Sequence, residues 1–292
     1  MISEAAKRRQ GFQAEDSDND ESLGPRPLPP PSVLDNRSAP PPPPQYSHLE
    51  LRQLEADGDT SHCWGSLPSR HVAVRGAHFL RDGRKVPSEP HSSCLAVELF
   101  RSASVVYDVA SRADSPVHSL QSRSAQQIAA PIFVANLIIP ATDGFYQLVL
   151  YFGLLRDERP SAASTLYERF INGTDAFRNA RLKLIPSVAE GPWLVQSAVG
   201  SRPAILGKAL KQRFSKGEGH FEVAIDCNSS PAAGRIVSLV KSYARSLVVD
   251  LAFVIEAQTA DELPERVLGC VRMLHIDLSE SGVPEFVQGA PV

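Results

Sequence analysis

Cysteine is scarce in this sequence, and its spacing argues against the sites that cysteine commonly builds. The four cysteines, at positions 63, 94, 227 and 270, lie far apart and form no CxxC pair. Zinc sites and disulfide frameworks depend on closely and regularly spaced cysteines. We therefore predict free thiols in a reducing cytosol, with no metal site and no disulfide.

Long apolar runs are also missing. A membrane-spanning helix needs about 20 predominantly apolar residues, and the longest candidate, 236–255, is interrupted by Lys241, Arg245 and Asp250. The N-terminal MISEAAKRRQ has a basic cluster with no apolar stretch after it, so we expect no secretory signal. The sequence predicts a cytoplasmic protein that crosses no membrane.

The short motifs of common enzyme classes are absent too. The sequence contains no GxSxG, no P-loop, no HExxH and no GxGxxG, which are the patterns that place nucleophiles, phosphates, zinc or dinucleotides. Its eight histidines follow no fixed ligand spacing. We therefore expect neither catalysis nor a cofactor.

Positive charge is too sparse for a nucleic-acid-binding domain. Residues 1–60 contain 6 basic and 11 acidic residues, a net charge of −5. The other 24 basic and 22 acidic residues leave 61–292 with a net charge of +2. Binding to a phosphate backbone requires clustered Lys and Arg, so we expect no nucleic-acid partner.

Proline is concentrated in one stretch near the beginning of the chain. Ten of the 24 prolines lie between Pro25 and Pro44, with almost no large aliphatic residues among them. Acidic, proline-rich segments bury too little apolar area to offset the entropy of ordering, so we predict that 1–60 is disordered. The proline runs at 25–44 favour polyproline II and suit a proline-recognition domain, although a linker is the simpler interpretation.

The pattern of residues 61–280 predicts one α+β domain, with a frayed tail at 281–292. Strands are expected where apolar residues alternate or run continuously between turn signals, at 71–80, 132–139, 146–152, 205–214, 221–227 and 267–276. The face of the strand 221–227 that carries Glu222 should be wet, because polar and apolar residues alternate there. Residues 111–130 have no clear period and are expected to form a surface loop.

Two helices have clear start signals. Ser161 can cap a helix that Gly173 ends, and Ser230-Pro231 combines a capping serine with proline at the first helical position. From Pro231 an apolar stripe predicts the longest helix, to about residue 257. The stripe consists of Ile236, Val240, Tyr243, Leu247 and Val254. We therefore predict an antiparallel sheet of five to seven strands with the helix 231–257 packed across it.

Asp250 is the most unusual residue of this predicted helix, because it lies on the apolar stripe between Leu247 and Val254. A carboxylate in such a place is costly unless it is paired. We predict a structural ion pair with Arg178 or Arg181. A catalytic role would need a second titratable group at a fixed offset, and the sequence supplies none.

Five residues are predicted to bind a ligand. Arg178, Arg181 and Lys183 could form an anion cradle, although solvated or ion-paired charges are the simpler interpretation. Trp193 is either a core plug or an interface anchor. Lys208, in the predicted strand 205–214, either snorkels to the surface or faces a polar cavity.

From Cys63 onward, the order of motifs resembles the C-terminal domain of the plant Enhanced Disease Resistance 2 family. The resemblance covers about residues 61–278. It is carried by CW (63–64), VRG (74–76), KVP (85–87), IFVANLIIP (132–140), YF (151–152), FINGTDAFRNARLKLIP (170–186), EGPWLVQSAVG (190–200), PAILGKAL (203–210), FEVAID (221–226), LVVDLAFVIEA (247–257) and LPERVLGCVR (263–272).

This resemblance implies a role at membranes. In the plant relatives the domain follows a pleckstrin-homology domain and a START lipid-binding domain, and the 60 residues ahead of it here are too short to be either. Phosphoinositide binding by the pleckstrin-homology part is therefore not transferred. Glu98 stands where relatives tend to have aspartate, 111–130 diverges, and no catalytic residue is carried over.

Two functions are compatible with the sequence. The first is a non-enzymatic, lipid-associated regulatory module that acts peripherally at a cytosolic membrane face, with an anionic lipid as partner. A helix grip around an apolar cavity, similar to START domains, would make lipid binding natural. The second is a protein-interaction scaffold with no lipid ligand. An apolar cavity beneath the long helix, large enough for an acyl chain, would favour the first.

Overall fold

The computed structural model describes residues 49–286, except 57, 125 and 157–159. Most of the predicted disordered region 1–60, and all of the proline runs at 25–44, lie outside the described residues. The scaffold hypothesis, which depends on those runs, stays a prediction.

At both ends the ordered domain extends beyond the boundaries expected from the sequence. Leu49 and Val283 are buried, although the sequence predicts disorder at 1–60 and a frayed tail at 281–292. Both segments attach to strand β4 (Ser92–Ser102): Leu99 donates its backbone N–H to the carbonyl of Leu49, and Arg101 donates to the carbonyl of Pro284. The segments before and after the predicted domain are therefore part of it, and both are hydrogen-bonded to β4.

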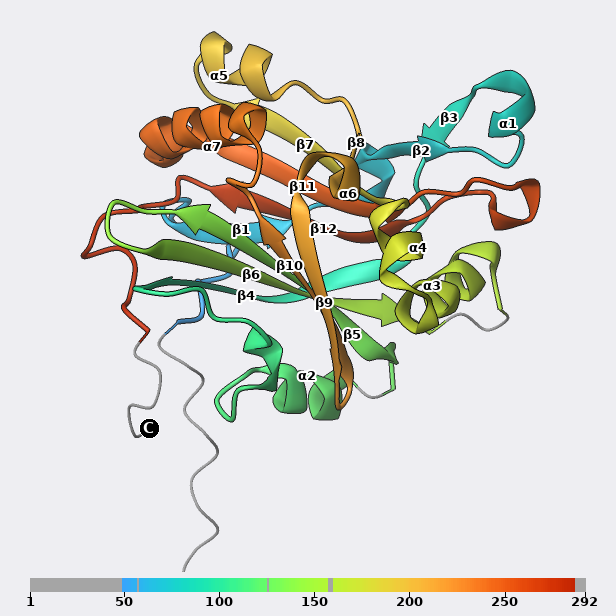
Figure 1. Cartoon of the computed structure of the whole chain (residues 1–292), viewed down its shortest axis with the longest axis horizontal. Helices are drawn as coiled ribbons and strands as arrows, with labels where there is room; N and C mark the ends of the chain where they lie inside the picture. Colours follow the sequence, from blue (N-terminus) through green and yellow to red (C-terminus); the bar gives the residue numbers. More distant parts are fainter. Residues whose placement is uncertain (1–48, 57, 125, 157–159, 287–292) are drawn as a thin grey trace, which may run out of the picture. The chain divides into compact units, whose positions relative to one another are not determined.

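Two five-stranded sheets form the core of the described part of the chain (Figure 1). In the first, β10 and β5 run parallel and the other neighbours antiparallel. In order across the sheet, its strands are β4, β6 (Phe145–Leu155), β5 (Ile128–Pro140), β10 (His220–Asp226) and β9 (Lys211–Gly217).

The second sheet is antiparallel throughout. In order, its strands are β1 (Cys63–Ser66), β12 (Val267–Leu274), β11 (Val248–Ile255), β7 (Leu182–Glu190) and β8 (Ala204–Ile205). A separate pair joins β2 (Ala73–Arg75) to β3 (Lys85–Pro87). The α+β class is thus confirmed, but the single sheet expected from the sequence is wrong, because the strands divide between two sheets.

Seven α-helices connect these strands in the described ranges, and most are short. They are α1 (Phe79–Asp82), α2 (Val117–Ser124), α3 (Ala162–Asn172), α4 (Asp175–Asn179), α5 (Trp193–Val199), α6 (Leu206–Ala209) and α7 (Pro231–Tyr243). Both predicted helix starts are confirmed. Ser161 accepts a hydrogen bond from the backbone N–H of Ser164 at α3, and Ser230 accepts one from Ala233 at α7.

The predicted helix 231–257 is wrong beyond Tyr243. After a 3₁₀ turn at Ala244–Ser246 the chain enters β11, which is hydrogen-bonded to β7 and β12. Both faces of β11 are covered: Ala252 and Val254 pack in one apolar cluster, and Phe253 and Ile255 pack in another. A strand that is buried on both faces has a continuous apolar sequence, which periodicity alone cannot distinguish from a buried helix.

The two sheets pack tightly at one end through aromatic side chains. Phe253 of β11 lies 6.0 Å from the ring of Phe133 in β5 and 5.9 Å from the ring of Phe152 in β6. Gly269 of β12 allows this approach, because a Cβ there would lie 2.4 Å from the Phe152 ring. The opposite ends of these same strands leave a space between the sheets, which is described below.

The prediction of a surface loop at 111–130 is wrong, and so is that of a wet face around Glu222. The segment contains the whole of α2, which contacts β5 of the first sheet, and it begins at the end of the 3₁₀ turn Val109–Ser111, which contacts β10 (Figure 1). Glu222 is only 1% exposed there. It accepts hydrogen bonds from the backbone N–H of Ala110 at 2.9 Å and from the amide of Asn136 at 3.3 Å. Burial raises the pKa of Glu222 above its ordinary value of 4.5.

This shift gives a pH dependence with a definite sign. Above the ordinary pKa, folded Glu222 keeps a proton that the unfolded chain has lost, so stability falls as the pH rises through that interval. In Glu222→Gln this loss should be absent, and its stability relative to the wild type should increase from about pH 4 to pH 7. Urea denaturation across that range measures the difference. A difference between the two proteins that stays constant with pH would contradict the prediction, because it would reflect only an altered hydrogen bond.

Candidate functional site: an apolar cavity between the sheets

A cavity of about 440 Å³ lies between the two sheets at the end away from the aromatic cluster. Of the 27 described residues that line it, 24 are apolar and none is acidic. The first sheet contributes side chains such as Leu99 and Leu148, and the second contributes side chains such as Leu251 and Met273. The volume lies within the range of pockets that bury small organic ligands, about 300–1,000 Å³.

Helix α7 covers this cavity. Ala233, Val237, Val240 and Ala244 follow one another at helical spacing and all line the cavity wall. None of the residues of α7 is buried, although an amphipathic helix usually buries its apolar stripe in the core. The stripe of α7 therefore faces the cavity instead of a packed interior.

Small side chains help to create the space. Five alanines line it where larger residues would fill a core, and they come from β8, α6, α7 and the 3₁₀ turn after α7. They are Ala204, Ala209, Ala232, Ala233 and Ala244. The cavity opens where lining residues are exposed, between the segment that includes Arg202 and Ala209 and the first half of α7 around Ile236.

Three polar residues, Arg202, Ser230 and Lys241, lie among the lining residues in the described part of the chain. The ammonium group of Lys241 donates to the carbonyl of Pro140 and lies 5.6 Å from the centre of the Tyr146 ring. Burial lowers the pKa of Lys241 below its ordinary value. The charges of the lining are thus two cations, which suit an anionic group on a bound molecule.

The cavity wall also contains a thiol, Cys227. Burial raises the pKa of Cys227 to about 12. Its Sγ lies 3.6 Å from the carbonyl oxygen of Ile225, to which it donates. Because the thiolate is the nucleophilic form of cysteine, this side chain behaves as an apolar wall.

The predicted ion pair of Asp250 with Arg178 or Arg181 is wrong. In β11, Asp250 lies directly opposite Arg272 of β12. Its two carboxylate oxygens accept from Nε and Nη2 of Arg272 at 2.7 and 2.8 Å, a bidentate pair. The error follows from the helix prediction, because the correct partner lies on the neighbouring strand.

Arg178 is committed to the protein itself. It pairs with Asp175 at 2.6 Å, donates to the carbonyls of Phe170 and Ile171, and stacks on the ring of Phe221 at 5.0 Å. These contacts fasten α4 to α3 and to the core. The simpler interpretation, an ion-paired charge, describes this residue.

Arg181 and Lys183 are buried and paired with two separate carboxylates. Arg181 lies 2.8 Å from Glu262, and Lys183 lies 2.6 Å from Glu265. Neither cation lines the cavity beneath α7. The predicted anion cradle is therefore not assembled, because each member already has a partner within the fold.

Trp193 and Lys208 lie on α5 and α6, two helices of which other residues line the cavity. Trp193, in the first turn of α5, is 78% exposed, so the core-plug interpretation is wrong. Lys208 lies in the short helix α6, not in a strand, because the predicted strand 205–214 divides into β8, α6 and β9. Its side chain is exposed, as the snorkelling interpretation expected.

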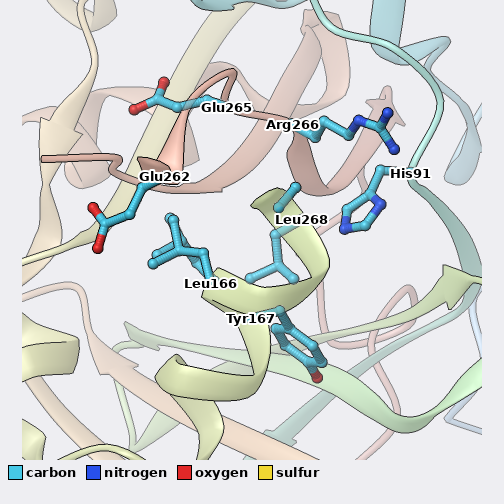
Figure 2. A pocket seen from close by; sticks show the side chains of 9 residues that line it. His91, Leu166, Tyr167, Glu262, Glu265, Arg266 and Leu268 are labelled. Atoms are coloured by element: carbon cyan, nitrogen blue, oxygen red, sulfur yellow. The ribbon is translucent and has the colours of Figure 1, made fainter. Parts of the chain in front are cut away.

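A much smaller cavity, of about 10 Å³, lies beside His91 and has room for no ligand except one water molecule. Figure 2 shows that the carboxylates of Glu262 and Glu265 point away from His91 and Arg266 there. Within the described ranges, no group of three or more His, Cys, Asp or Glu side chains is arranged to hold a metal. The cavity beneath α7, with its volume of about 440 Å³ and its largely apolar lining, is the candidate site.

Sequence reasoning identified only part of this site. Ile236, Val240 and Leu247 were assigned to the apolar stripe of the long helix, and all three line the cavity. The strand residues and Arg202 were missed. The five alanines were a usable signal, because small residues on an otherwise aliphatic face leave space that a packed core would fill.

Together, these features define an α+β domain of two sheets built around an apolar cavity with a helix as its cover. The chain belongs to the family described as Protein ENHANCED DISEASE RESISTANCE 2, C-terminal, whose sequence model matches residues 64–277. The resemblance inferred from the motifs is thereby confirmed.

A curated relative, "Protein ENHANCED DISEASE RESISTANCE 2-like" from Arabidopsis thaliana, is 37% identical over 227 residues. The match covers 76% of this chain but only 30% of the length of that relative. None of the helices in the described ranges has both the length and the apolar character needed to cross a lipid bilayer.

Proposed function

We propose that this domain binds a lipid with one acyl chain in the cavity beneath α7. It would act as a non-enzymatic regulatory module, peripherally at a cytosolic membrane face. The observation that carries the proposal is the cavity itself, with 24 apolar side chains among the 27 that line it.

The free energy that filling the cavity would contribute supports an apolar ligand. Unfilled cavities cost about 24 cal/mol per Å³, so filling 440 Å³ could gain on the order of 10 kcal/mol. This is an upper bound, since the cavity is open on one side and water reaches its rim. Even half of that amount is comparable with the total stability of many domains, about 5–15 kcal/mol. An aliphatic chain matches these walls, whereas a polar ligand would find few hydrogen-bonding partners.

The charged groups favour an anionic headgroup. Arg202 and Lys241 are cationic, and the described lining contains no carboxylate that would repel an anion. A fatty-acid carboxylate or a phosphate at the opening would thus be attracted by these two cations and repelled by no charged residue of the lining. In this proposal α7 takes the part of the START-like helix grip, with Pro231–Tyr243 in place of the longer helix expected from the sequence.

Filling the cavity with protein atoms tests the proposal. We expect purified protein to bind cis-parinaric acid, a fluorescent fatty acid, in a saturable manner. Ala233→Trp places an indole in the cavity and should weaken this binding at least about tenfold, or about 1.4 kcal/mol. Ser238→Trp adds the same side chain to the exposed surface of the same helix and should leave the affinity unchanged.

Two results would reject the proposal. One is that the wild-type protein fails to bind the fatty acid. The other is that Ala233→Trp and Ser238→Trp bind it as well as the wild type does, which would place the fatty acid outside the cavity. Circular dichroism of each variant verifies that the fold is intact.

A further inference from the structure

Large apolar side chains are exposed in one region beside the cavity. In the described ranges, four of the six exposed large apolar residues lie on α5 and α7: Trp193 (78%), Leu194 (53%), Ile236 (37%) and Tyr243 (37%). The two helices are in contact and lie side by side (Figure 1). We call these four residues the apolar face. Large apolar side chains gathered on one surface commonly mark a binding surface.

The local structure of α5 holds two of these side chains away from the protein. Val195 is the one buried residue of this seven-residue helix. Gly191 and Gly200 flank the helix with positive φ angles of 149° and 63°, which other residues rarely adopt. Between these glycines, the first turn of α5 exposes Trp193 and Leu194 to solvent.

The segments that carry the apolar face bear only basic charges, although exposed Glu190 precedes the first of them and Asp277 lies with Tyr243 in the lining of a neighbouring hollow. Residues 191–210 and 231–243, which comprise α5, β8, α6 and α7, contain Arg202, Lys208, Arg235 and Lys241 but no aspartate or glutamate. Arg202 and Arg235 are exposed and form no ion pair with any residue in the described part of the chain. Tryptophan beside basic residues is typical of surfaces that enter the headgroup region of an anionic bilayer.

We infer that the apolar face docks on an anionic membrane and brings the cavity opening against the lipid. Ile236 connects the two sites, because it belongs to the apolar face and also lines the cavity. The end of α5 and the loop after it, through Val199 and Arg202, line the cavity as well. The inference rests on the proposed function, since the membrane is the source from which the cavity takes its lipid.

The two tryptophans allow a direct test. Trp64 is buried, so a change in indole emission on binding a surface reports Trp193. With vesicles of phosphatidylcholine and phosphatidylserine, we expect a blue shift and protection of the emission from acrylamide quenching. Vesicles of phosphatidylcholine alone should give a much smaller effect, because the cations lack an anionic partner. Trp193→Phe should abolish the shift.

A second pair of variants measures affinity in vesicle cosedimentation. The double variant Trp193→Ser/Leu194→Ser should lower affinity for the anionic vesicles at least about tenfold. Leu80→Ser removes an equally exposed leucine on α1, which is outside the apolar face, and should bind as the wild type does. Both variants should still bind cis-parinaric acid, since neither changes the cavity wall.

The outcomes separate this inference from the proposed function. Fatty-acid binding without vesicle binding, or vesicle binding with unchanged Trp193 emission, would overturn the docking face and leave the cavity function intact. Vesicle binding that requires Trp193, in a protein that binds no fatty acid, would support the docking face and reject the cavity function. A dimer that shields Trp193 and dissociates in the double variant would show that the apolar face binds a second copy of the chain, and would overturn membrane docking.

Discussion

Phe253→Ala is expected to lower the free energy of unfolding by about 3–5 kcal/mol, the usual cost of truncating a buried phenylalanine. Phe253 is completely buried and contacts aromatic rings of the opposite sheet. Its removal leaves a cavity where the two sheets are held together. Neighbouring side chains can fill little of that space, because Gly269 already allows the Phe152 ring to pack directly on the backbone.

Equilibrium urea denaturation measures this loss, and the melting temperature should fall with it. For a domain of 150–250 residues, each kcal/mol corresponds to about 2–4 °C, so a decrease of about 6–20 °C is expected. Leu80→Ala is the matched control, because Leu80 is large, apolar and 54% exposed. It should change stability by less than about 0.5 kcal/mol. Equal effects of the two variants would mean that the aromatic cluster does not join the sheets.

Elements with local signals could be predicted from the sequence. The apolar runs 132–139 and 146–152 lie in β5 and β6, which form a hairpin with Gly144 in a positive-φ conformation. The capping serines of α3 and α7 are also correct. In each case, the residues that determine the element are neighbours in the chain, so no tertiary information is required.

Elements that depend on distant partners could not be predicted. The stretch 248–255 is apolar on both sides because two separate clusters cover it. Its partners in the neighbouring strand β7 are 58 to 73 residues away in the chain. The same reason explains Asp250, whose partner Arg272 is defined by strand register. Sequence spacing along a supposed helix contains no information on that register.

The candidate site was only partly predictable, for a related reason. A cavity arises from the separation of two sheets and from side chains that are small where they face each other, and neither is visible in one segment. Trp193 and Lys208 belong to a stretch, 193–209, whose residues partly line the cavity, and a glycine-flanked tryptophan beside basic residues is a local pattern. The buried cations Arg181 and Lys183 were selected by the same criterion, and only their carboxylate partners distinguish them.

The ion pair of Lys183 and Glu265 gives the other large expected effect. Glu265→Ala should destabilise the protein by about 3–5 kcal/mol, because breaking a buried pair leaves the remaining charge without compensation. Glu265 accepts from Lys183 Nζ at 2.6 Å and from the backbone N–H groups of Arg75 and Ala257 at 3.1 and 3.0 Å. The lower end of the range is favoured, since Glu256 lies 3.7 Å from Lys183 and offers partial compensation.

The control is an ion pair of similar geometry at the surface. Glu89 lies 2.8 Å from Arg266 but its side chain is 72% exposed, so Glu89→Ala should cost only about 0–1 kcal/mol. Urea denaturation at neutral pH compares the two variants. A loss no greater for Glu265→Ala than for Glu89→Ala would show that solvent reaches Lys183 and that burial does not strengthen the pair.

The pH dependence of Glu265→Ala identifies Lys183 as the source of the instability. Burial lowers the pKa of Lys183, and Glu265 opposes that shift. Without Glu265, the folded protein should release the lysine proton at a lower pH, while the unfolded chain retains it up to about 10.4. The unfolded state then binds more protons, so the stability of the variant rises with pH. The deficit relative to the wild type should therefore shrink between about pH 7 and pH 10, and a constant deficit would assign the loss to the backbone hydrogen bonds of Glu265 instead of to the charge on Lys183.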